Sequence, residues 1–334
     1  MIRRLAILVL QLLVTAAGIY YIFHDPQKRA QVLKALQQSD WHWLLLGWAC
    51  YSLVESLATV RWQLLLRVQG IALDWLKAGA IVIIGLFFNM FLPGLIGGDA
   101  MRLYFVFKEA PQRKTRATLS VAMDRLLGLV SIFLLAVIVV LFRFDWLNRF
   151  PPTAHITYLA LAILGGSALF VVALLITVGY GILNRLPEPF PFRGAIVEAG
   201  EALRLYGRQP WICATALGLT TLSHLAYYVT YYCAARSLHG AAGRSPGFID
   251  FVSIMPLVNT ITGAPISFGG VGLRETLFQK LLGHLVGVPA AVGALAASLG
   301  YAIQASWGLI GGISYLLVPF GKRRKSVPKR SPHR

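Results

Sequence analysis

The sequence predicts an all-α polytopic membrane protein with about six full transmembrane helices and two re-entrant helical hairpins in an inverted repeat. Three observations predict this fold class: the composition, several long apolar runs and a duplicated motif. Of the 334 residues, 57% are hydrophobic and only 13% are charged, whereas soluble domains carry about 25% charged residues. An apolar run of about 20 residues is long enough to cross the hydrocarbon core as a helix.

Six apolar runs are long enough to predict full transmembrane helices. In chain order they are residues 5–23, 41–66, 118–142, 155–183, 211–236 and 290–318. The first run follows Arg3 and Arg4 and lacks a clear small-x-small cleavage site. We therefore interpret it as a retained span rather than a signal peptide.

Two further apolar regions, about 78–107 and 248–288, contain the motif Pro-x-x-x-Gly-Gly-x-x-x-Arg. One copy lies in FLPGLIGGDAMR and the other in APISFGGVGLRE, 172 positions later. The motif residues are Pro93, Gly97, Gly98, Arg102, Pro265, Gly269, Gly270 and Arg274. Because proline and glycine interrupt helices, each region is predicted to enter the membrane and return as two half-helices. The alternative is that both motifs are kinks in ordinary spanning helices.

Basic residues predict the orientation, because Lys and Arg favour the cytoplasmic side. The Lys/Arg-rich segments predicted to be cytoplasmic are 108–116, 184–209 and 322–334. Re-entrant hairpins keep these segments, and both termini, on one side. They also divide the chain into two units of opposite orientation, 41–142 and 211–318. We expect a transmembrane domain over 1–321 and a disordered basic cytoplasmic tail over 322–334, attracted to anionic lipids.

Inverted repeats with broken helices at matching positions are typical of transporters whose substrate site lies near the bilayer midplane. A half-helix that begins after Gly98 presents free backbone N–H groups, which favour anions. Arg102 lies one turn further on, and Arg274 holds the matching place in the second copy. Two arginines beside two helix N-termini suit a phosphate group. The glycines Gly97, Gly269 and Gly270 belong to the same predicted site.

Neighbouring polar residues have both structural and substrate-binding interpretations. Asp99 is expected either to cap its half-helix and pair with Arg102, or to contact substrate. Glu275, next to Arg274, is expected to be a similar partner. Asp124 and Arg125 are expected to form an interfacial ion pair or part of the cavity wall.

Four more polar residues fall within the apolar regions. Glu55 has no adjacent base, so its carboxyl group is a candidate proton carrier. Arg61 is interpreted as an end-anchor that reaches the membrane surface. Asn89 and Asn259 precede the two motif prolines, where each either satisfies backbone groups freed by the break or contacts substrate.

The sequence contains no motif that predicts an enzyme, a metal site or a cofactor site. We find no Asp-rich diphosphate motif, nucleophile elbow, Walker loop or Cys/His cluster. We therefore expect no cofactor and no bound metal. The basic tail directly follows an apolar span, which favours a membrane contact over nucleic-acid binding.

Three segments together resemble a known family. FFNMFLPGLIGGDAMR, MDRLLGL and PISFGGVGLRE are similar to the flippase-like family of the transmembrane region of lysylphosphatidylglycerol synthases, as is the RW-x-L-L pattern at 61–65. The resemblance covers about 40–318. Bifunctional members carry a soluble aminoacyl transferase domain after this region, and we expect a stand-alone member without it.

The resemblance implies a lipid flippase or scramblase of the bacterial inner membrane. Its cargo would be an anionic phospholipid or a polyprenyl-phosphate-linked lipid, and envelope biosynthesis enzymes would be further partners. Two alternatives stay open: a membrane-bound glycosyl or phospholipid transferase, and a non-transporting lipid-binding partner of an envelope synthase.

Overall fold

The computed structural model describes most of the chain between residues 33 and 317. The described residues are 33–91, 97–180, 193–242, 244–264 and 267–317. The predicted span 5–23, the tail 322–334 and the motif prolines Pro93 and Pro265 lie outside them. Within the described residues every regular element is helical.

Five helices are 27 or more residues long. They are α3 (Trp41–Val68), α6 (Lys114–Leu147), α7 (Pro151–Gly179), α9 (Pro210–Arg236) and α13 (Ala290–Leu317). Among the described residues, α3, α6 with the short turn before it, α7 and α9 are long and apolar enough to cross a membrane. α13 matches the predicted span 290–318 in length but is not among those four helices.

Each motif region forms two short helices that pack against each other. The first pair is α4 (Trp75–Phe91) and α5 (Gly97–Glu109), and the second is α11 (Phe248–Gly263) and α12 (Leu273–Val286). Lys77 at the start of α4 pairs with Glu109 at the end of α5. α4 and α5 are therefore antiparallel, which is the helical-hairpin geometry expected for this region.

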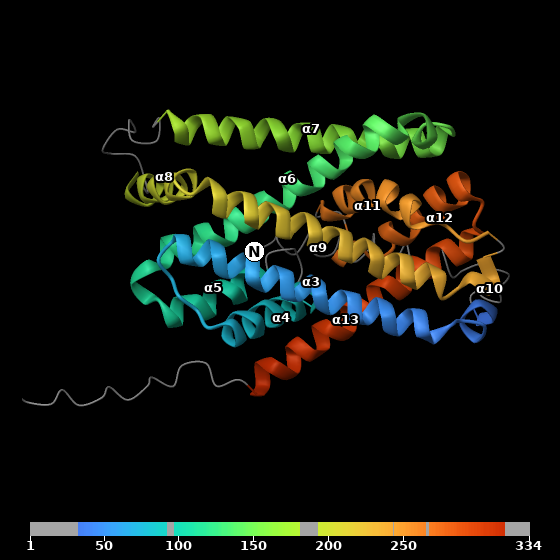
Figure 1. Ribbon diagram of the computed structural model, residues 1–334, viewed down its shortest axis with the longest axis horizontal. Coiled ribbons are helices and arrows are strands. Elements are labelled where there is room, and N and C mark those ends of the chain that lie inside the picture. Colours follow the sequence, from blue (N-terminus) through green and yellow to red (C-terminus); the bar gives the residue numbers. More distant parts are fainter. Residues whose placement is uncertain (1–32, 92–96, 181–192, 243, 265–266, 318–334) are drawn as a thin grey trace, which may run out of the picture.

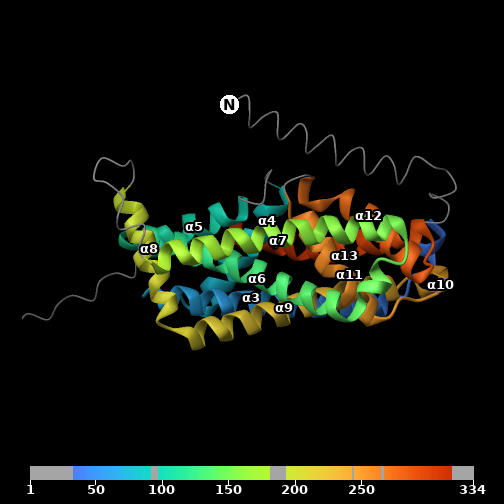
Figure 2. The same cartoon turned by 90° about the horizontal axis from the view of Figure 1, so that it is seen from above.

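The second hairpin is antiparallel as well. The ring of Phe251, near the start of α11, lies 6.0 Å from the ring of Phe278 in the middle of α12. At the other end, Thr262 of α11 contacts Gly270, just before α12. Figures 1 and 2 show the two hairpins in opposite halves of the long axis, with α4 and α5 toward the end that carries α8 (Arg193–Gly207) and α11 and α12 toward the end that carries α10 (His239–Ala242).

Helices α3 and α9 pack against each other and run in opposite directions. Gly47, early in α3, contacts Cys233, late in α9, whereas Arg61, late in α3, hydrogen-bonds Thr220 in the first half of α9. The final helix of each unit packs on the hairpin of the other unit: α6 contacts α11, and α13 contacts α4. The two units thus share this contact between a final helix and the opposite hairpin.

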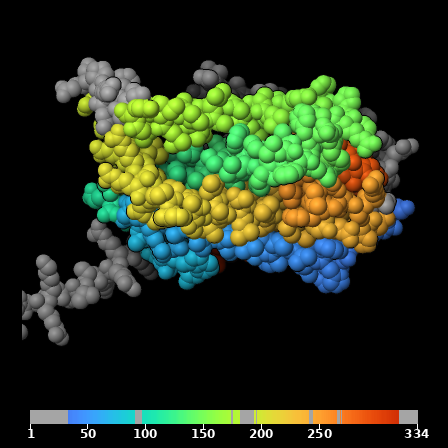
Figure 3. Space-filling model, turned by 45° about the horizontal axis from the view of Figure 1, so that its top comes forward, coloured from blue at the N-terminus to red at the C-terminus, as the bar shows by residue number. Residues whose placement is uncertain are grey.

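Small residues allow these close helix contacts. A Cβ atom at Gly311 of α13 would overlap the backbone of Ile83 in α4, and one at Gly312 would overlap the ring of Phe87. Glycines at helix contacts let backbones approach closely, which is the usual way membrane helices associate. α7 lies at the periphery and exposes large apolar side chains such as Leu169 and Phe170. Figure 3 shows α7 and α9 along one face, with α6 visible between them.

Two hydrogen bonds join helix α8 to the C-terminal end of α3, at one end of the bundle. The Tyr206 hydroxyl donates to the carbonyl oxygen of Leu65, and Gln69 donates to that of Ala202. Burial raises the pKa of the Tyr206 hydroxyl well above its ordinary range, so this group stays a neutral donor.

Candidate functional site

A buried carboxylate, Asp124, joins three helices in the first unit. Its Oδ1 atom accepts a hydrogen bond of 2.6 Å from Arg61 on α3, and its Oδ2 atom accepts one of 3.1 Å from Arg102 on α5. The side chains of Asp124, Arg102 and Arg61 are 4%, 10% and 12% exposed. At this burial an unpaired charge costs several kcal/mol, so each group requires the others.

Two expectations from the sequence are corrected by this arrangement. Arg61 is not an end-anchor that reaches the membrane surface, because its guanidinium group is buried against Asp124. Asp124 and Arg125 do not pair with each other. Arg125 instead holds Asp99 through two hydrogen bonds of 2.8 Å each, a fork that suits a carboxylate. The Asp99 carboxylate is 4.0 Å from the Arg102 guanidinium group, so the Asp99–Arg102 pair is weaker than the Asp99–Arg125 pair.

The start of α5 is occupied by protein groups. The backbone N–H of Gly98 donates to Oδ1 of Asn89 at 2.8 Å, so it is not free for an anion. A Cβ atom at Gly98 would overlap the carbonyl oxygen of Gly85 and the amide of Asn89. Gly97 is buried beside it. Asn89 and this glycine pair therefore close the hairpin, in line with the structural interpretation.

The matching arginine of the second unit has different surroundings. Arg274 is 6% exposed, and its Nε and Nη1 atoms are buried without a hydrogen-bond partner. Its Cζ atom lies 5.8 Å from the ring centroid of Tyr231 on α9 and 5.2 Å from that of Tyr301 on α13. Within the described residues, no carboxylate lies at ion-pair distance from this guanidinium.

The expected partner of Arg274 has another role. Glu275 is 4% exposed, and its Oε2 atom accepts the backbone N–H of Gly272 at 2.6 Å while Oε1 accepts the Ser298 hydroxyl at 3.2 Å. This carboxylate caps α12 and ties it to α13. It therefore satisfies the helix N-terminus and leaves Arg274 unpaired.

The second Gly-Gly pair differs from the first in backbone conformation. Gly269 and Gly270 have φ of 60° and 78°, a region that favours glycine. A Cβ atom at Gly270 would lie 3.0 Å from Nη2 of Arg274 and 3.1 Å from the Cβ atom of Thr262. Gly270 thus leaves the room that the guanidinium group fills.

The remaining candidates lie at the edges of these clusters. Glu55 on α3 is 8% exposed and faces Tyr51, with Arg61 and Arg102 as its nearest cations. Asn259 on α11 is half-buried beside the Tyr228 hydroxyl and belongs to neither arginine cluster. The partners that sequence reasoning missed, Tyr231 and Tyr301, carry no local signal, because tyrosine is common in membrane helices.

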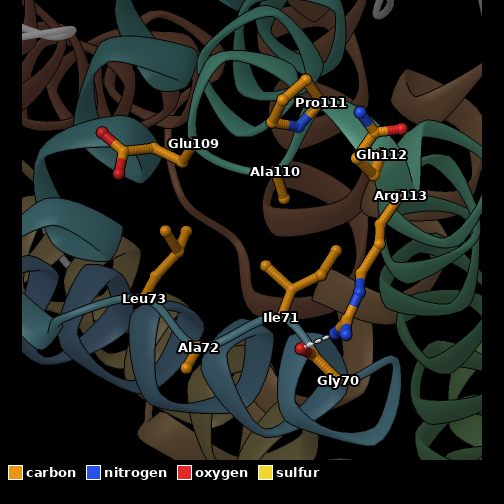
Figure 4. A pocket seen from close by; sticks show the side chains of 9 residues that line it. All are labelled: Gly70, Ile71, Ala72, Leu73, Glu109, Ala110, Pro111, Gln112 and Arg113. Carbon is orange, nitrogen blue, oxygen red and sulfur yellow. Dashed lines mark hydrogen bonds between the residues drawn. The ribbon is translucent and has the colours of Figure 1, made fainter. Parts of the chain in front are cut away.

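A surface pocket of the described residues lies apart from the two arginine clusters. A pocket of about 340 Å³ lies between the loop after α3 and the turn after α5. Figure 4 shows Arg113 reaching across it to the carbonyl oxygen of Gly70. Among all residues that the structure describes, no group of three or more His, Cys, Asp or Glu side chains is placed to hold a metal ion.

The fold and the clusters define a multi-pass helical membrane protein with paired and unpaired arginines in its interior. The profile of the family described as the lysylphosphatidylglycerol synthase TM region matches residues 8–311. The chain belongs to this family.

Three similar proteins are from archaea. A UPF0104 membrane protein of Methanothermobacter thermautotrophicus is 24% identical over 274 residues, which cover 75% of this chain and 76% of that protein. UPF0104 membrane proteins of Methanocaldococcus jannaschii and Pyrococcus horikoshii are each 26% identical, over 39% and 44% of this chain. These two matches span 42% of each relative.

Proposed function

We propose that this protein moves an anionic lipid between the two leaflets of a cell membrane. The cargo class is an anionic phospholipid or a polyprenyl-phosphate-linked lipid. The head group would cross through the protein interior while the apolar chains stay in the bilayer. Membership of a family named for the membrane region of a lipid-modifying enzyme supports a lipid as the cargo.

One observation carries this proposal: Arg274 is a buried arginine whose Nε and Nη1 groups have no partner. A buried guanidinium without a counter-charge is costly and marks a functional site in a membrane protein. Two N–H groups of an arginine match two oxygens of a phosphate. The rings of Tyr231 and Tyr301 hold the guanidinium plane in place.

The hairpins provide the access path in this proposal. Helices of 17, 13, 16 and 14 residues are about 20–26 Å long at about 1.5 Å per residue, short of a core of about 30 Å. We propose that each hairpin is re-entrant from its own side of the membrane. Because Arg274 is almost fully buried, the head group reaches it only when the units move relative to each other. Rocking of inverted units is the usual solution.

The test is lipid exchange between leaflets in proteoliposomes. Fluorescent phosphatidylglycerol is reduced from outside with dithionite, so that exchange appears as continued loss of fluorescence. Charge-assisted hydrogen bonds contribute about 1.5–3 kcal/mol, so Arg274→Gln should slow exchange by about tenfold to a hundredfold. Arg274→Lys keeps the charge but loses the fork, and we expect an intermediate rate.

The matched control is Arg149→Gln, which removes an exposed arginine stacked on Phe150. Its exchange rate should equal that of the wild type. If wild-type protein moves neither phosphatidylglycerol nor a polyprenyl phosphate faster than empty vesicles do, the proposed function is wrong. If Arg274→Gln leaves the rate unchanged, the assignment of the site is wrong.

A further inference from the structure

Glu55 lies beside the first arginine cluster, and the ion pairs of that cluster leave its carboxyl group without a role. Its side chain is buried in the middle of α3. Among the described residues no cation lies at ion-pair distance from its carboxyl group. Its nearest cations, Arg61 and Arg102, already share Asp124. Its hydrogen-bonding neighbour is Tyr51, one turn earlier on the same helix.

A row of buried and partly buried tyrosines leads from Glu55 to the unpaired arginine. The ring of Tyr51 lies 6.3 Å from the ring of Tyr227 on α9. The Tyr227 hydroxyl lies 3.1 Å from that of Tyr231, whose ring faces Arg274. Polar groups in a membrane interior are kept where they contact one another or an ion path. This row therefore places polar hydroxyl groups between the carboxyl group and the guanidinium group.

The formal charges of the two arginine clusters do not balance without Glu55. The arginines Arg61, Arg102 and Arg274 face the carboxylates Asp124 and Glu275, which leaves one positive charge. The Asp99–Arg125 pair adds no net charge. An uncompensated charge in a low-dielectric interior costs several kcal/mol, so one further negative charge is required. An ionised Glu55 supplies it when no substrate is bound, and the phosphate of a substrate supplies it when bound.

We propose that binding of an anionic head group at Arg274 is linked to uptake of one proton by Glu55. The proton comes from water and adds to a carboxylate oxygen of Glu55, and no covalent bond of the lipid changes. With substrate bound and Glu55 protonated, the buried groups balance again. This inference rests on the proposed function, because it takes the anion site at Arg274 as given. It makes the protein a proton-coupled carrier whose cargo and proton travel together.

The ionisable groups that act directly on the Glu55 carboxyl group are Tyr51 and Arg61 on α3 and Arg102 on α5. The helices packed against α3 carry further ionisable groups: Lys77 on α4, Asp124 on α6, His224 and Tyr227 on α9, and Tyr301 on α13. Lys77 is paired with Glu109 and partly exposed. His224 has a buried Nε2 atom without a hydrogen-bond partner and lies near Arg61. Among these described groups, His224 is the competing proton acceptor, and it provides a control.

The experiment measures protons taken up when a short-chain anionic lipid binds to the full chain in detergent. Dihexanoyl phosphatidylglycerol is the probe, because its phosphodiester keeps one negative charge throughout the range used. Calorimetric titrations in buffers of different ionisation enthalpy give the number of protons per bound lipid. Within the pH range where binding and protonation are linked, we expect close to one proton per bound lipid for the wild type and an affinity that falls by about tenfold per pH unit.

Two variants separate the outcomes. Glu55→Gln keeps the shape of the side chain and should bind the lipid with no proton uptake and no pH dependence. His224→Gln should keep the uptake of the wild type. If the wild type binds the lipid without proton uptake, or Glu55→Gln still takes up a proton, the coupling is refuted while the Arg274 site stands. If the wild type and Arg274→Gln both fail to bind, the proposed function and the coupling are refuted together.

Discussion

The largest predicted effect on stability comes from Asp124, because this carboxylate serves two buried arginines. Asp124→Asn keeps the size of the side chain but removes the charge that holds Arg61 and Arg102. Breaking a buried ion pair by removing one partner costs about 3–5 kcal/mol, mostly because the remaining charge stays buried. Since the variant leaves two guanidinium groups unpaired, we expect a loss of about 4 kcal/mol or more. At about 2–4 °C per kcal/mol, the fall in Tm is about 8–16 °C.

Thermal unfolding in detergent with a thiol-reactive dye measures this effect. Cys233 on α9 is 1% exposed and reacts only when the helices separate. The matched control is Lys77→Gln, which removes the partner of Glu109 in an ion pair whose side chains are 50% and 25% exposed. Exposed pairs contribute less than about 1 kcal/mol. A fall in Tm for Asp124→Asn no larger than that for Lys77→Gln would refute the reasoning.

Two smaller perturbations test the hairpin and a helix start. Gly98→Ala forces α4 and α5 apart at a backbone contact, so the free energy of unfolding should fall by about 1–3 kcal/mol and Tm should fall with it. Its control is Gly128→Ala on α6, where the added methyl group meets open space and should leave Tm unchanged or slightly higher. At the start of α3, the His42 side chain holds the pKa of the Asp40 carboxyl below its ordinary value of 3.8. A depressed pKa contributes stability that is present above the unfolded-state pKa and is lost as pH falls through the folded-state pKa. The protection of the His42 amide, measured as its exchange rate relative to the unstructured amide at the same pH, should therefore fall on acidification in the wild type but not in Asp40→Asn.

The sequence allowed prediction of most helices but not of the contacts between them. The region 78–107 became α4 and α5 because its apolar run is interrupted at a Gly-Gly pair, a local signal. The boundaries of 118–142 and 155–183 were less accurate, because α6 begins at Lys114 among basic residues and α7 begins at Pro151. The proline-first start is a known helix signal that the hydropathy pattern alone does not contain.

The ion pairs could not be predicted, because they depend on long-range packing. Arg61 and Asp124 are 63 positions apart in the sequence. Their contact depends on how α3 and α6 are placed relative to each other along the bundle axis. The predicted pairing of Arg274 with its neighbour Glu275 was wrong because it used only their adjacency in the sequence. Glu275 follows Arg274 directly, yet successive side chains on a helix point in different directions, so Glu275 reaches the N-terminus of α12 instead.

The two predicted units share contacts between helices but differ in charge, and we propose that this difference gives the anion site its selectivity. In the first unit α6 supplies Asp124 to Arg102. By contrast, α13 has no Asp, Glu, Lys or Arg along its whole length and meets Arg274 through the ring of Tyr301. If both arginines were paired, an incoming anion would have to displace a carboxylate already held by the protein. If both were unpaired, the empty protein would bury two uncompensated charges, at several kcal/mol each. One paired and one unpaired arginine avoids both costs, since a single distant carboxylate such as Glu55 can balance the empty state and yield to the substrate by taking up a proton.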